Sequence, residues 1–104
     1  MKRAVESFDE LKKRAAATTL EFEAAAKKLS HIYEEMAKQT SPNSVRGRAV
    51  RRHAVMNAII SGEDKRVYKL VESFLAQEGV KEELKCEMAI LLLGMSFMPP
   101  RKGR

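Results

Sequence analysis

A seven-residue repeat of apolar positions runs along the first third of the chain, from about Val5 to Gln39, where no proline or glycine interrupts it. Its first position is taken by Phe8, Ala15, Phe22, Leu29 and Met36, and its second by Ala4, Leu11, Thr18, Ala25 and Ile32. We call these ten residues the heptad seam. Two apolar positions per heptad are typical of a helix that pairs in a coiled coil. The pattern therefore predicts one long amphipathic helix, which at 1.5 Å per residue would extend to about 50 Å.

A helix of that length exceeds the core of one small domain. A chain of 104 residues buries only a modest core by itself, so the long helix should overhang it unless it bends at Thr18 and Thr19, whose β-branched side chains are weak helix formers. Alanines in the heptad seam allow another helix to approach closely. We therefore expect a homodimer in which a second copy of the chain covers the exposed seam, and the pattern leaves both parallel and antiparallel pairing open.

Turn signals divide the rest of the chain into three shorter helices, over residues 42 or 45 to 61, 63 to 78 and 81 to 97. Pro42 ends the first helix, and Ser41 or Ser44 is the predicted cap of the second. Gly62 and Gly79 are the expected stops of the second and third helices. The chain is thus predicted to be all-α, with one long helix and three shorter ones in a single domain over residues 1–98, followed by a basic tail over residues 99–104.

The predicted fourth helix is apolar on all sides over its second half, from Met88 to Met98. A helix of this kind is surrounded by protein. In so small a chain, we expect it to occupy either the centre of a bundle or an interface.

Basic residues are concentrated where the second helix begins. The net charge is +6, yet no acid lies between Met36 and Gly62, where Lys38 and four arginines give a local charge of +5. Like charges one turn apart and cations near a helix N-terminus are both unfavourable, and a bound anion would relieve that cost. The planar guanidinium fork of arginine suits phosphate oxygens.

The leading hypothesis is therefore a nucleic-acid-binding protein that contacts the phosphate backbone of duplex RNA or DNA largely without reading sequence. No aromatic residue lies in the basic stretch to stack on bases. The first-rank contacts are Arg46, Arg48, Arg51 and Arg52, with His53 and Lys38 second. Secondary basic candidates are Lys65, Arg66, Lys69, Arg101, Lys102 and Arg104.

Three other interpretations remain open. The arginines could pair with acids of the first helix, Glu34 and Glu35 or Glu21 and Glu23, in which case the chain is a helical protein–protein interaction module such as an adaptor, chaperone or regulatory subunit. An acidic protein or a membrane surface could also be the partner. Finally, the second and third helices could form a helix-turn-helix that presents Lys65, Arg66, Lys69 and Ser73 to a DNA groove.

No pattern in the chain predicts an enzyme, a cofactor or a metal site. His31 and Glu35 lie one helical turn apart but lack further ligands, so an ion pair is the expectation. The single cysteine, Cys86, cannot form an internal disulfide, and we expect it to be buried. The N-terminus has no signal-peptide pattern, and the apolar run at Met88 to Met98 is too short to span a bilayer. A cytoplasmic or nuclear location is expected, and secretion is not.

Overall fold

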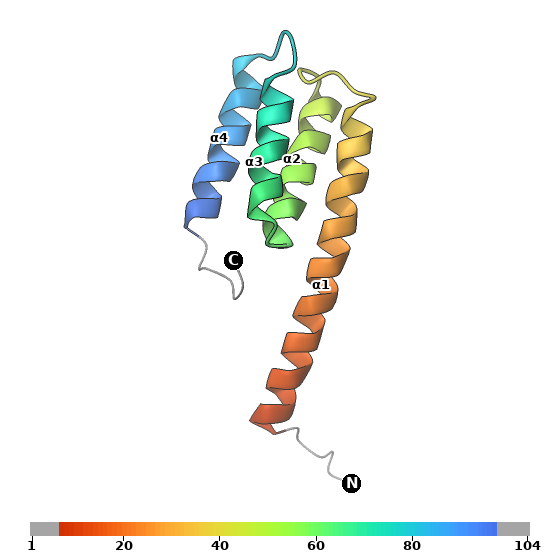
Figure 1. Ribbon diagram of the computed structural model, residues 1–104, viewed down its shortest axis with the longest axis vertical. Helices are drawn as coiled ribbons and strands as arrows, with labels where there is room; N and C mark the ends of the chain where they lie inside the picture. Colours follow the sequence, from red (N-terminus) through yellow and green to blue (C-terminus); the bar gives the residue numbers. More distant parts are fainter. Residues whose placement is uncertain (1–6, 98–104) are drawn as a thin grey trace.

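The structure, a computed structural model, describes residues 7–97, and all of the regular secondary structure in that range is helical. Figure 1 shows the four helices: α1 (Phe8–Ala37), α2 (Val45–Ile60), α3 (Asp64–Leu75) and α4 (Glu82–Ser96). The prediction of an all-α chain with four helices and no strand is thus confirmed for the described part of the chain.

Local sequence determines where the helices begin and end. The Ser44 hydroxyl oxygen accepts a hydrogen bond from the Gly47 amide at 2.9 Å, so α2 begins at Val45 with Ser44, not Ser41, as its cap. Gly62, at φ 79°, supplies the left-handed turn between α2 and α3. Helix α3 ends at Leu75, earlier than predicted, because the next three residues are exposed and offer no large apolar side chain to bury.

The helices run alternately up and down, and α2 is the central one. Figure 1 shows α2 between α1 and α3, with α4 on the far side of α3, and α2 packs against each of the other three. Helix α4 packs against α2 and α3 but not against α1. The prediction that α4 could occupy the centre of the bundle is therefore wrong, because α2 holds the central place and α4 contacts only α2 and α3.

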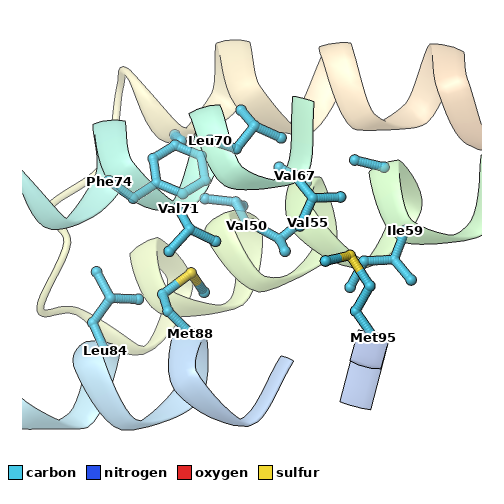
Figure 2. Close-up of a cluster of buried hydrophobic side chains, with 13 residues drawn as sticks. Val50, Val55, Ile59, Val67, Leu70, Val71, Phe74, Leu84, Met88 and Met95 are labelled. Atoms are coloured by element: carbon cyan, nitrogen blue, oxygen red, sulfur yellow. The ribbon is translucent and has the colours of Figure 1, made fainter. Parts of the chain in front are cut away.

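The hydrophobic core lies among α2, α3 and α4. Figure 2 shows side chains of these three helices pointing toward one another, among them Val55, Val67, Phe74 and Met88. Helix α1 contributes only small buried residues, namely Ala26, Ser30 and Ala37. Small side chains let α1 and α2 approach closely, and the Ser30 hydroxyl donates a 2.7 Å hydrogen bond to the Ala54 carbonyl.

The first half of α1 extends past the other helices (Figure 1). Every residue from Ser7 to Phe22 is exposed, and the first buried residue of the helix is Ala26. Helix α1 is 30 residues long, and its exposed half makes local contacts such as the Ser7 cap and the hydrogen bond from the Thr19 hydroxyl to the Ala15 carbonyl.

Gly47 is required where α2 meets the preceding loop. A Cβ built on Gly47 would overlap the backbone carbonyl oxygen of Ser41, whereas a Cβ on Gly94 of α4 would meet nothing within 4 Å. We expect Gly47→Ala to destabilise the fold by about 1–3 kcal/mol through overpacking. Gly94→Ala, the matched control, should stabilise it by about 0.5–1 kcal/mol through helix propensity. Urea unfolding followed by circular dichroism measures both, and equal effects of the two substitutions would contradict the close approach.

Candidate functional sites: the arginine helix and the heptad seam

Arg51 is the largest fully buried side chain of the described chain, with none of its surface exposed. A guanidinium carries five N–H donors, and each of them has an acceptor within the protein. The Nε atom donates to the Gln77 side-chain oxygen at 2.9 Å. Nη1 donates to the Gly47 carbonyl and the Thr40 hydroxyl, and Nη2 donates to the Ala37 and Thr40 carbonyls, at 3.0 to 3.1 Å.

This network ties the end of α1 to α2 and to the segment after α3. Ala37 is the last residue of α1, where backbone carbonyls lack intrahelical partners and attract cations, and Thr40 lies in the loop that follows. The guanidinium also lies 5.6 Å from the centre of the Phe74 ring. Burial lowers the pKa of Arg51 from its usual range, but arginine remains charged at neutral pH. With every donor used inside the fold, we remove Arg51 from the set of candidate phosphate contacts.

Arg48 and Arg52 share one carboxylate on α4. Arg52 Nη1 lies 3.1 Å from Glu87 Oε2, and Arg48 Nε lies 3.5 Å from Glu87 Oε1. Arg48 Nη1 also donates to the Asn43 carbonyl at 2.9 Å. The acid that pairs with these two arginines therefore lies on α4, whereas the pairing interpretation had expected acids of the first helix.

The other first-rank and second-rank candidates lie nearer the surface. Arg46 is exposed on the first turn of α2. Lys38 is exposed and donates to Glu35 at 2.9 Å, and this hydrogen bond, followed by the attraction of the Glu35 charge, raises the pKa of Lys38. His53 is partly buried and packs its ring against Tyr33, with the ring centres 5.1 Å apart.

The secondary basic residues of α3 line one groove, and one of them is also bonded to α1. Arg66 is mostly buried and bonds to Glu34 of α1 at 3.0 Å. It lines a shallow groove of α3 together with the exposed Lys65, Tyr68 and Lys69 and with Glu72. Arg101, Lys102 and Arg104 lie outside the described residues. Helices α2 and α3 lie side by side and run in opposite directions (Figure 1), and the helix-turn-helix interpretation stays a prediction.

The heptad seam is not the side of α1 that packs against α2. Its large apolar residues within the structure are all exposed, namely Phe8, Leu11, Phe22, Leu29, Ile32 and Met36. At 3.6 residues per turn, the buried residues Ala26, Ser30 and Ala37 lie roughly 80° around the helix from the centre of the seam. The seam is thus an unpartnered apolar stripe along the whole of α1.

A second apolar surface lies between α2 and α4. An open groove of about 340 Å³ is lined by Met56, Ile59, Ile60, Ile90, Leu91, Gly94 and Met95. The neighbouring Leu93 and Phe97 are 60% and 80% exposed. Cys86 on α4 is exposed as well, which contradicts the expectation of a buried thiol, because α4 at the edge turns only part of its circumference toward the core.

Sequence reasoning missed the acceptors that bind the arginines: Thr40, Gln77 and Glu87. Gln77 and Thr40 carry no charge, and Glu87 lies 35 residues from Arg52, so no local pattern pairs them. One sequence signal could have indicated these distant partners. No acid lies near the arginines in sequence, so any arginine that is buried must find its hydrogen-bond acceptors on other segments.

Within residues 7–97, no group of three or more His, Cys, Asp or Glu side chains is placed to hold a metal ion. No helix in that range combines the length and apolar character needed to cross a bilayer. Comparison with protein-family models, curated proteins and solved structures found no significant match to this chain.

Replacing Arg51 by lysine tests the buried network. Lysine keeps the charge but offers three donors in place of five, so carbonyl acceptors at the end of α1 lose their partners. We expect Arg51→Lys to lower the free energy of unfolding by about 2–4 kcal/mol. The control Arg46→Lys, on the same helix but exposed, should change it by no more than about 0.5 kcal/mol. Urea titration of both variants measures the difference, and similar small effects would contradict the structural role of Arg51.

Proposed function

We propose that this protein is a helical protein–protein interaction module that forms a homodimer through the heptad seam of α1. One observation carries the proposal: six large apolar side chains follow one another along α1, and each is exposed. Scattered apolar residues are ordinary on protein surfaces, but contiguous apolar stripes mark interaction sites. The seam also keeps the heptad spacing that coiled-coil pairing requires.

The exposed half of α1 supports the same proposal. Helices in proteins owe little of their stability to propensity and depend on the packing of their apolar side. From Phe8 to Phe22 every residue of α1 is exposed. A partner helix lying on the seam would supply that packing along the whole helix.

The structural roles of the arginines also favour an interaction module. Arg51 and Arg66 are bonded within the bundle, and Arg48 and Arg52 pair with Glu87. Most of the arginines that suggested a phosphate site therefore stabilise the fold through internal contacts. The apolar groove between α2 and α4 is a second surface on which such a module could hold another protein.

Charged substitutions in the seam should separate the dimer. Phe22 and Leu29 are one heptad apart in the seam and are 59% and 41% exposed. We expect wild-type protein at micromolar concentration to sediment as a dimer and the Phe22→Lys plus Leu29→Lys variant to sediment as a monomer of 11.8 kDa. Leu20 is 68% exposed on the opposite side of α1, so Leu20→Lys is the control that should leave the dimer intact. Circular dichroism confirms that each variant stays helical.

A wild-type monomer at micromolar concentration would overturn the proposed homodimer. Equal loss of the dimer in the Leu20→Lys control would instead show that the dimer contact is not specific to the seam.

Nucleic-acid binding is a second candidate function, favoured by one observation. Arg48 and Arg52 share the single carboxylate of Glu87, so this cluster keeps a charge of +1, and the exposed Arg46 and Lys38 lie on the adjoining segments of the chain. These four residues are the proposed phosphate contacts, because Arg51 is bonded inside the fold and His53 packs against Tyr33. RNA and DNA duplexes present the same backbone charge and would both be bound through counterion release.

Salt dependence distinguishes phosphate contacts from nonspecific attraction. If Arg46 and Arg52 each neutralise a phosphate, Arg46→Gln plus Arg52→Gln should reduce the slope of log affinity against log salt by about 2. The control Lys13→Gln plus Lys27→Gln removes the same charge from exposed positions of α1 and should leave the slope unchanged. Fluorescence anisotropy with duplex RNA and duplex DNA at several salt concentrations measures these slopes. Equal slopes in both variants, or no binding at low salt, would exclude this candidate.

A further inference from the structure

We infer that the two copies of α1 pair antiparallel, in a register that places Glu21 opposite the partner's Lys28. This inference rests on the proposed homodimer and names its geometry. It commits the heptad seam to one occupant, the same seam of a second copy. Three features of α1 carry it: which flank of the seam is open, how the charges alternate along that flank, and how large and small residues alternate in the seam.

One flank of the seam is exposed, whereas the other packs against α2 over part of its length. The residues that precede the first seam position of each heptad form a charged flank of Arg14, Glu21, Lys28 and Glu35, all exposed. The residues that follow the second seam position form the other flank: Lys12, Thr19, Ala26 and Tyr33. On that flank Ala26 is buried and Tyr33 packs against His53 of α2. A partner helix therefore meets the charged flank.

The open flank favours antiparallel pairing. In a parallel coiled coil the charged flank of one helix lies beside the other flank of its partner, so Glu21 and Lys28 would approach the partner's Ala26 and Tyr33. Neither offers an opposite charge, and both are turned toward α2. In an antiparallel coiled coil the charged flank lies against itself, so acids and bases of the two copies can meet.

The charges on this flank alternate, and the alternation selects one register. When Glu21 lies opposite the partner's Lys28, Arg14 lies opposite the partner's Glu35, and the two-fold axis repeats both pairs. Sliding one helix by a heptad in one direction brings Glu21 against the partner's Glu21. Sliding it in the other direction brings Lys28 against the partner's Lys28. Like charges at such positions are destabilising, so both neighbouring registers are disfavoured.

The same register pairs most of the large seam residues with smaller ones. Phe22 meets the partner's Ala25, and Ile32 meets the partner's Ala15. The remaining layers place Leu29 against the partner's Thr18 and Met36 against the partner's Leu11. Alternating large and small residues across facing positions fills a helix interface without voids or overpacking. Parallel pairing would instead stack Phe22 on Phe22 and leave layers of paired alanine.

The register also explains the exposed half of α1. Residues 11 to 36 of the two helices would overlap over about 39 Å at 1.5 Å per residue. The exposed first half of each α1 would then lie along the second half of its partner's α1. The two bundles of α2, α3 and α4 would lie at opposite ends of the paired helices.

A charge-reversal pair tests the register. Glu21→Lys alone places lysine against the partner's Lys28, and Lys28→Glu alone places glutamate against the partner's Glu21. Each variant alone should dimerise about tenfold more weakly than wild type, and an equimolar mixture should recover wild-type affinity as a heterodimer. Lys27→Glu, exposed but off the seam and its charged flank, is the control that should keep wild-type affinity. Dimerisation of both single variants at wild-type affinity, with no preference for the mixture, would overturn the register.

Spin-label distances test the orientation independently. In a Cys86→Ser background, single labels are placed at Ala24→Cys, near the expected two-fold axis, or at Glu10→Cys, near the end of the helix. Antiparallel pairing predicts a short distance at position 24, under about 20 Å, and a separation of about 40 Å at position 10. Short distances at both positions would show a parallel dimer and overturn the inference while leaving the homodimer in place. Absence of dipolar coupling at both positions, together with sedimentation as a monomer, would overturn the proposed function itself.

Discussion

The Arg51 guanidinium occupies the point where the end of α1, the start of α2 and the segment after α3 meet. Its five donors are bonded to Ala37, Thr40, Gly47 and Gln77. Burying a guanidinium group is costly unless every donor has an acceptor. The loop between α1 and α2 therefore cannot move without breaking several of these hydrogen bonds. The close approach of Gly47 to Ser41 follows from the same constraint.

Contacts inside the fold offset much of the electrostatic cost of placing arginines at the start of α2. Helix α2 has no acid in its first turn, and its cations oppose the positive end of its own dipole. The negative C-terminal end of α1 lies against Arg51, and the carboxylate of Glu87 lies between Arg48 and Arg52. These contacts offset part of the charge without an external anion, and a net charge of +1 remains on Arg48, Arg52 and Glu87. For this reason the apolar surfaces, rather than the basic ones, give the stronger indication of function.

Helix positions were readable from the sequence, whereas side-chain partners were not. Serine caps, glycine stops and apolar periods are local signals, and they predicted four helices with ends within a few residues of those observed. The contact between Arg51 and Gln77 spans 26 residues and joins a charged group to a neutral amide. No spacing rule links two such residues, so the buried network became visible only in three dimensions. The exposure of Cys86 was missed for a related reason, because it depends on which side of α4 meets the core.

The strongest apolar pattern of the sequence does not mark the side of α1 that meets its own bundle. The buried residues of that side are Ala26, Ser30 and Ala37, which contribute little to a hydrophobic period because they are small or polar. The large residues follow a separate line on the same helix and remain exposed. A helix with two distinct contact sides, one small and close-packed and one large and regular, is suited to two different neighbours. Since α2 takes the first side, the regular period of the second is best explained by a helix from another chain.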